Sequence, residues 1–447
     1  MRRSAPVIII IVFVLALVLA LWVLPRTFKQ ADIRAAAEDI ALLEAEDPAP
    51  PPGARNLFNA LWLLPYNIAA GEEEALMREY GEALMYSHDV PQALASRRWN
   101  EEDLRQLACT DNEQQSCLEH IRQRLPEYQT LLQQYRPLIE HIDTLADYEV
   151  LHSGDWLKRS DAAQDPVPSY QYLFLGRNAA MAEYLGGDTA AAVQRSCRQI
   201  KLGHTLAAQG DNLITAMIGN ALMDRNLSWL AQMLAEQPQW AHKLPQSCGA
   251  VLDTSMAAES LTLCRAMKGE YRLMSNLLAR MANSDDEAEV QGAKQAGKLA
   301  RWLKMDWDAE HSQVLAARRV APYCGAQVQA WAEQDAAERV VLPLSDKRTR
   351  WACLHNIVGC SAYLIGDSDY DQYRLRLADT EMRRRAVQAA VAVHRLPENA
   401  DAAAIDAALA PYHSPSRRLQ WDEQTASIRY PVYSEAQQGK NSIPLQP

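Results

Sequence analysis

The sequence predicts an all-α fold, either an irregular helical bundle or an array of helical hairpins, with one N-terminal transmembrane helix and a small C-terminal β-hairpin. Three observations predict this class. Alanine, leucine and glutamine are abundant while phenylalanine is scarce at four residues, which favours helix over sheet. Apolar residues recur at helical spacing along most of the chain. The first apolar run, residues 7–24, contains no polar side chain.

The run over residues 7–24 is long enough to cross a lipid bilayer. Its eighteen residues would form a helix of about 27 Å, close to the thickness of a hydrocarbon core. Trp22 lies near one end, where an aromatic side chain suits the membrane interface. A cleavable signal peptide usually has a shorter apolar core and a small-residue cleavage site. We therefore predict an uncleaved signal anchor.

Charge around this run predicts the orientation of the anchor. Residues 1–6 carry Arg2, Arg3 and the terminal amine, which are unfavourable to move across a membrane. The tail is therefore expected in the cytoplasm of a bacterial-type cell, with the bulk of the chain facing the periplasm. Arg26 and Lys29 on the other side weaken the charge asymmetry, so a cytosolic body remains the alternative.

The chain has eight cysteines, an even number that allows complete pairing in an oxidising compartment. Cys109 and Cys117 flank a polar segment that could bend into a loop, so we predict a disulfide between them. Cys353 and Cys360 would lie too far apart in one continuous helix. Either Gly359 breaks that helix or these two cysteines pair elsewhere. Buried free thiols are the alternative for all eight.

Residues 25–53 are predicted to form a stalk. A helix with an apolar stripe comes first, and consecutive prolines then stop it and form an extended spacer. The stripe consists of Ile33, Ala37, Ile40 and Leu43. Residues 54–151 follow as a first helical lobe. Residues 152–169 lack sustained periodicity and contain prolines, so we place a boundary there, before a second lobe over 170–412.

The clearest pattern in the body is a succession of helices separated by Gly-Asp turns. A helix over 170–185 ends at two glycines, and Asp188 or Thr189 then caps a second helix. Gly210 ends the second helix, and Asp211 or Asn212 caps a third that continues to about residue 236. Two successive turns of this kind are typical of antiparallel helical hairpins.

This stretch, residues 170–236, resembles tetratricopeptide-type helical repeats. It lacks the Trp-Leu-Gly-Tyr pattern of that family, and no period of about 34 residues continues along the chain. The resemblance implies a concave surface that binds segments of other proteins. It assigns no role to an individual residue.

Further along, residues 248–282 are predicted to form one long helix with a methionine and leucine stripe, and residues 369–395 a final long helix. His204 is expected to be a core histidine on the apolar face of its helix. In the last segment, 413–447, two short runs, residues 417–421 and 427–433, predict a β-hairpin. Pro431 restricts the second strand to an edge of the sheet. The last dozen residues are expected to be disordered.

The sequence contains few signs of catalytic chemistry. It has no zinc-protease, phosphate-loop or dinucleotide motif, and neighbouring acid–histidine pairs such as Glu310–His311 do not face each other on a helix. An enzyme would need distant candidates to converge. These candidates are His88, His152, Asp155, Glu310 and His311. We expect no catalytic residue, no cofactor and no metal.

Two charged clusters have structural explanations. Asp367, Asp369 and Asp371 imitate the start of a calcium-binding loop, but the later positions of that pattern fail, so helix capping is expected. Arg383, Arg384 and Arg385 form the tightest basic cluster and are expected on a solvated helix face. With a net charge of −11 and no large basic patch, the chain is not expected to bind nucleic acid.

These features together predict a scaffold, adaptor or assembly factor of an envelope complex, with the membrane and an unidentified envelope protein as partners. A periplasmic hydrolase whose site is assembled from distant loops is the first alternative. A ligand-binding ectodomain is the second.

Overall fold

The computed structural model describes most of the chain and is predominantly helical, with a small antiparallel sheet near the C-terminus, as predicted. It describes residues 12–13, 23–45, 48–69, 71–87, 90–109, 115–154, 167–283, 307–341, 347–365, 369–397 and 399–446. The predicted tail and anchor therefore lie mostly outside the described residues, as does most of the boundary at 152–169. Among the described helices, none has both the length and the apolar character required to span a membrane.

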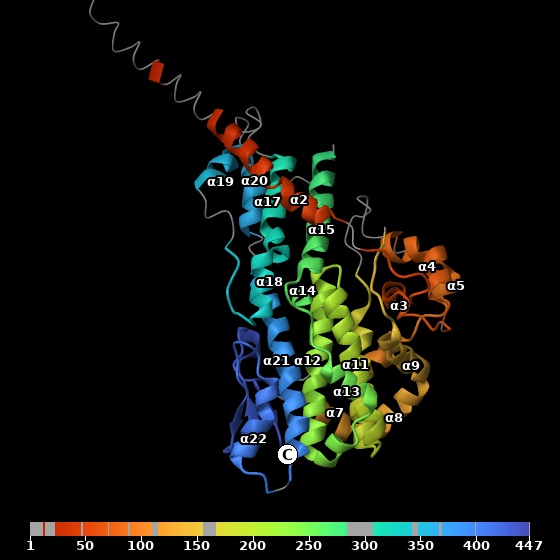
Figure 1. Cartoon of the computed structure of the whole chain (residues 1–447). Coiled ribbons are helices and arrows are strands. Elements are labelled where there is room, and N and C mark those ends of the chain that lie inside the picture. The colour runs from red at the N-terminus through yellow and green to blue at the C-terminus, as the bar shows by residue number, and fades with distance from the viewer. Residues whose placement is uncertain are drawn as a thin grey trace, which may run out of the picture.

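Long helices form the centre of the molecule (Figure 1). They are α10 (Leu175–Leu185), α11 (Thr189–Gln209), α12 (Leu213–Glu236) and α21 (Tyr370–His394), and each packs against the next. The Asp188 carboxylate accepts a hydrogen bond from Ala191 N at 3.0 Å and caps α11. The Asn212 side chain caps α12 in the same way, through Thr215 N at 2.8 Å. Both residues are among the caps that the sequence predicts.

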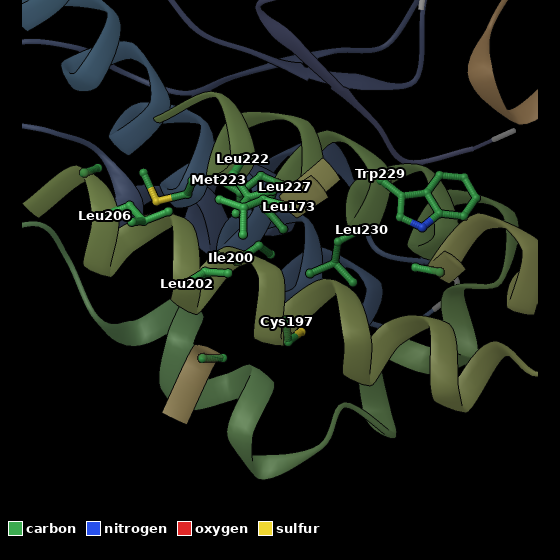
Figure 2. Close-up of a cluster of buried hydrophobic side chains, with 14 of the residues drawn as sticks. Leu173, Cys197, Ile200, Leu202, Leu206, Leu222, Met223, Leu227, Trp229 and Leu230 are labelled. Atoms are coloured by element: carbon green, nitrogen blue, oxygen red, sulfur yellow. The ribbon is translucent and has the colours of Figure 1, made fainter. Parts of the chain in front are cut away.

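The core between α11 and α12 is made of leucines that are fully removed from solvent (Figure 2). Leu202 and Leu206 of α11 meet Leu222, Met223 and Leu227 of α12, and all five are 0% exposed. Burying one such side chain contributes about 1.5–3 kcal/mol. The packing of α11 on α12 therefore contributes strongly to the stability of the body.

The N-terminal lobe consists of short helices that lie beside α10 and α11 (Figure 1). They are α3 (Leu57–Leu63), α4 (Glu73–Glu82), the π-turn η1 (Ala83–Ser87), α5 (Gln92–Ala95), α6 (Glu101–Leu107), α7 (Cys117–Gln123), α8 (Leu125–Gln134) and α9 (Arg136–Thr144). The 3-10 turns η2 (Leu145–Asp147) and η4 (Tyr170–Phe174) connect this lobe to α10. The predicted helix over 170–185 thus begins with a 3-10 turn.

The prediction of one helix over 248–282 is wrong. After the 3-10 turn η5 (Pro238–His242), the structure has α13 (Gln246–Asp253), α14 (Ala258–Leu261) and α15 (Cys264–Asn283). Contacts with α21 replace helical hydrogen bonds at the first break, because Arg384 binds the Leu252 carbonyl and Glu381 accepts from Met256 N at 3.4 Å. At the second break Leu263 has a positive φ of 66°.

A second group of helices packs on α15 at one end of the molecule (Figure 1). It contains α2 (Ala37–Glu44), α17 (Ala309–Val320), η7 (Ala321–Cys324), α18 (Ala326–Glu333), α19 (Lys347–Ala352), η9 (Cys353–His355) and α20 (Ile357–Ile365). Residues 23–35 are also helical and lead into α2, so the predicted stalk helix lies along α15 and α17. Its buried face is Asp32, Ala36 and Leu43, whereas Ala37 of the predicted stripe is exposed.

The C-terminal segment contains the predicted hairpin and adds a third strand to it. After α22 (Ala402–Leu409) and η10 (Ala410–Tyr412), three antiparallel strands lie in the order β1 (Gln420–Asp422), β2 (Ser427–Arg429) and β3 (Ser442–Pro444), with the 3-10 turn η11 (Glu435–Gln437) before the last strand. The expected disorder of the last dozen residues is wrong, because β3 pairs with β2 and buries Ile443 against Ile428. Strand β2 is consequently central, and it ends before Pro431.

The structure pairs all eight cysteines and leaves no free cysteine. The pairs are Cys109–Cys117, Cys197–Cys248, Cys264–Cys324 and Cys353–Cys360, with Cα–Cα separations of 5.5, 5.1, 4.6 and 5.8 Å. The Cys109–Cys117 pair is the one that the sequence predicts. The helix between Cys353 and Cys360 is interrupted at Asn356, with φ of −149°, rather than at Gly359.

Candidate functional site

The candidate acid–base residues belong to separate places in the structure. His152 lies in a turn that exchanges hydrogen bonds with Asn56: the Asn56 amide donates to the His152 carbonyl at 2.7 Å, and His152 N donates to Asn56 Oδ1 at 3.0 Å. Glu310 and His311 lie on α17, at the other group of helices. His88 and Asp155 lie outside the described residues. The described candidates therefore form no shared acid–base site.

His311 is the centre of a buried polar cluster. It is 0% exposed, and its Nε2 lies 3.6 Å from Oδ2 of Asp32 in the N-terminal helix. Its Nδ1 lies 3.4 Å from the Asn356 amide nitrogen, which donates to Ser312 Oγ at 2.9 Å. Because His311 and Asn356 are both 0% exposed, the geometry is that of a structural cluster.

The same cluster holds the N-terminal helix to α17 by ion pairs. Lys29 Nζ lies 2.6 Å from Asp308 and 3.0 Å from Glu310, while Arg318 binds Asp32 at 3.0 Å. Burial disfavours the ammonium, but the bonds to Asp308 and Glu310 outweigh burial and raise the pKa of Lys29. We call this set the anchor junction. It comprises Lys29, Asp32, Asp308, Glu310, His311, Arg318 and Asn356.

The calcium-like aspartates bind arginines. Asp369 lies 3.0 Å from Arg339, and it makes no capping hydrogen bond although it occupies the N-cap position of α21. Asp371 lies 3.3 Å from Arg374 and accepts from Val340 N at 2.7 Å. The third aspartate, Asp367, is outside the described residues. No group of three metal-ligating side chains occurs in the described part of the chain.

The expectation that the arginine cluster of α21 faces solvent is wrong for two of its members. Arg383 and Arg384 are 4% and 3% exposed. Arg383 lies 2.6 Å from Asp224 of α12 and donates to the Lys440 carbonyl at 2.6 Å, which ties the C-terminal segment to the central helices. Arg384 lies 2.6 Å from Glu381 and binds α13 through Leu252. These residues hold elements together.

A cavity of about 320 Å³ between α11, α13 and η2 is a candidate binding site. We call it the α11–α13 cavity. It is lined by Ala146, Asp147, Cys197, Arg198, Lys201, His204, Thr205, Ser247, Ala250, Val251 and Thr254. The disulfide between Cys197 and Cys248 fixes the spacing of the two helices that form its walls. Its surface is mainly apolar, and its lining also includes charged and hydroxyl side chains.

Among the described residues that line the cavity, Lys201 is a cation without an ion-pair partner in the described part of the chain. Arg198 lies 2.5 Å from Asp147 and also donates to the Asp143 carbonyl at 3.0 Å. Lys201 is exposed and makes no ion pair with any described residue. Burial lowers the pKa of His204, although Glu381 and the Ser255 backbone oppose this effect. His204 therefore favours the neutral ring near pH 7, and the described lining residues carry a net positive charge because Lys201 is not offset by a described carboxylate.

Sequence reasoning missed this site and placed His204 in the core. His204 is half-buried, and its Nε2 has no hydrogen-bond partner among the described residues. A signal was present, because Arg198, Lys201 and Thr205 follow each other at helical spacing along α11. A polar face of this kind is also what a solvated helix shows, so only the packing of α13 reveals the cavity.

Comparisons of this chain with protein-family models, with curated proteins and with solved structures find no match.

Proposed function

We propose that this protein is a membrane-anchored scaffold whose helical body faces an oxidising compartment and binds a segment of an envelope protein. The observation that supports binding is the α11–α13 cavity, whose mainly apolar lining includes Lys201, a cation that makes no ion pair with a described residue. The complete pairing of the cysteines supports the compartment, because such pairs persist in oxidising spaces. The apolar run over residues 7–24 supports the anchor.

The chemistry of the cavity indicates what the partner segment contains. Ala146, Ala250 and Val251 offer a surface for one aliphatic side chain. Lys201 and Thr205 also line the cavity and lie about one helical turn apart on α11. The ammonium and the hydroxyl suit a carboxylate, since a charge-assisted hydrogen bond is among the stronger polar contacts. The proposed ligand is therefore a peptide segment with an aliphatic residue next to an aspartate, a glutamate or a C-terminal carboxylate.

Site-specific photo-cross-linking in intact cells tests this function. Incorporating p-benzoylphenylalanine at Val251 should give a discrete adduct with another envelope protein. The same amino acid at Ile214, which is 49% exposed and does not line the cavity, should not. Replacing the cation by Lys201→Glu should reduce the adduct by at least about tenfold, as expected for a lost charge-assisted contact of about 1.5–3 kcal/mol, and Lys201→Arg should preserve it. Equal cross-linking from Val251 and Ile214 would exclude the cavity as the binding site.

A second candidate is a sensor for a small organic anion. The volume of about 320 Å³ falls within the range of small-molecule pockets. In that case a carboxylate ligand should raise the melting temperature of the isolated protein, and Lys201→Glu should remove the effect. An unchanged melting temperature across a panel of aliphatic carboxylates would favour the peptide.

A further inference from the structure

Two large apolar side chains are exposed close together in sequence on α19 and α20. Trp351 is 45% exposed and Ile357 is 46% exposed. The disulfide between Cys353 and Cys360 closes the turn between them, and the buried Asn356 fixes the start of α20. Gly359 brings α20 against α17 so closely that an added Cβ would meet the Ser312 side chain. The exposed pair is thus held by a rigid support.

This exposed pair lies beside the N-terminal helix. Asn356, which precedes Ile357, accepts a hydrogen bond from Asp308 N at 3.1 Å, and the Asp308 carboxylate binds Lys29 at 2.6 Å. Leu24, the last residue of the apolar run, precedes Lys29 by five positions, or about 7.5 Å along a helix. Figure 1 shows α19 and α20 next to the N-terminal helix, at the end of the molecule where residues 23–35 leave the body.

The sequence of this segment is basic. Residues 347–365 contain Lys347, Arg348 and Arg350 and no acidic residue, in a chain whose net charge is −11. Basic residues near a membrane attract anionic lipid headgroups, and tryptophan favours the interface between headgroups and hydrocarbon. An aromatic, an aliphatic and three basic residues beside an anchor helix are the composition of a membrane-surface contact.

We propose that α19 and α20 form a second membrane contact, in which Trp351 and Ile357 enter the headgroup region of an anionic bilayer. The inference rests on the membrane anchor of the proposed function. The anchor junction holds α17 and α20 at the level at which the N-terminal helix leaves the bilayer, so the body lies against the membrane surface. The α11–α13 cavity would then lie at a fixed distance from the membrane surface, where its partner segment reaches it.

Photo-cross-linking of the full-length chain in vesicles tests the contact. The protein carries p-benzoylphenylalanine at Trp351, at Ile357 or, as a control, at Ile214, which is also exposed. Vesicles containing phosphatidylglycerol should give lipid adducts from the first two positions and not from the third. Replacing Lys347 and Arg348 by glutamine should lower the adduct yield by about fivefold for each charge removed.

The outcomes separate this contact from the anchor. Lipid adducts at positions 351 and 357 no more abundant than at 214, or protein adducts in their place in native membranes, would overturn the second contact. Extraction of the full-length chain by alkaline carbonate would contradict the anchor instead. If carbonate extracts the chain but lipid adducts still form at positions 351 and 357, the membrane contact of α19 and α20 is supported and the anchor is not.

Discussion

Several buried charges in this protein are matched by opposite charges from distant segments. Arg417 binds Asp335 and Asp379, which are 82 and 38 residues away in the sequence. Burial raises the pKa of Asp379, while hydrogen bonds from the N–H groups of Ser434 and Tyr433 and the nearby Arg417 guanidinium oppose this. Breaking one buried pair of this kind typically costs about 3–5 kcal/mol, because the remaining partner stays buried and unpaired. These pairs therefore fix the C-terminal sheet on α21.

The partners of these buried charged residues could not be predicted from the sequence. Arg383 binds Ser228, 155 residues away, and no local pattern shows such a partner. Glu381 and Arg384 do stand three positions apart, a spacing that can form a pair on one helix. That spacing occurs on exposed helices too, so it does not reveal that both side chains are buried.

His204 leads to a prediction about pH. Burial lowers its pKa below the ordinary value of 6.5, so the folded protein favours the neutral ring. Its contribution to stability should be complete above pH 6.5 and be lost as the pH falls through the lower folded-state pKa. Urea unfolding at about pH 7.5 and at about pH 5.5 measures how much the free energy of unfolding falls in acid. This decrease should be smaller for His204→Gln than for the unmodified chain.

The comparison must isolate His204 from the other histidines. Burial also lowers the pKa of His141, His394 and His413. Both proteins will therefore lose stability in acid, and the difference between them is the quantity to measure. An identical loss in the variant would show that His204 is not held neutral by burial.

At the scale of elements, local chemistry made the hairpins of α10, α11 and α12 predictable. The starts of α11 and α12 depend on caps within three residues, which the sequence shows directly. Elements that depend on distant contacts were missed. The break between α13 and α14 forms against α21, and β3 exists because Ile443 pairs with Ile428 of β2. The α11–α13 cavity belongs to the same class, since its two walls meet only in the folded protein.

Close contact between α11 and α12 requires glycine. A Cβ added at Gly203 would lie 2.7 Å from Met223 N and 2.8 Å from the Gly219 carbonyl oxygen. One added at Gly219 would lie 2.7 Å from the Gly203 carbonyl oxygen. Because these neighbours are backbone atoms, Gly219→Ala should push the helices apart and lower the free energy of unfolding by about 1–3 kcal/mol, measured with urea.

Gly249 of α13 provides the matched control. A Cβ there would meet no atom within 4 Å, so Gly249→Ala should stabilise the helix by about 0.4–1 kcal/mol. If Gly219→Ala and Gly249→Ala changed the free energy of unfolding by similar amounts, the close approach of α11 and α12 would be contradicted.

At the scale of the whole molecule, two disulfides join segments far apart in the chain. Cys197–Cys248 connects α11 to α13, and Cys264–Cys324 connects α15 to η7, with sequence separations of 51 and 60 residues. Loops of this length correspond to a stabilisation of about 4 kcal/mol each in the chain-entropy model. Together with the anchor junction, they join the central helices, the N-terminal helix and the α17–α20 group into one body.

The pairing of the cysteines gives the most direct test of the proposed exported, membrane-anchored body. Cells that produce the full-length chain are lysed in denaturant with excess N-ethylmaleimide and no reductant, and the adducts on the intact protein are counted by mass spectrometry. An exported body should carry no adduct, because all eight thiols are paired. A body in the reducing cytosol would carry up to eight adducts, and that result would contradict the compartment and the envelope partner inferred from it.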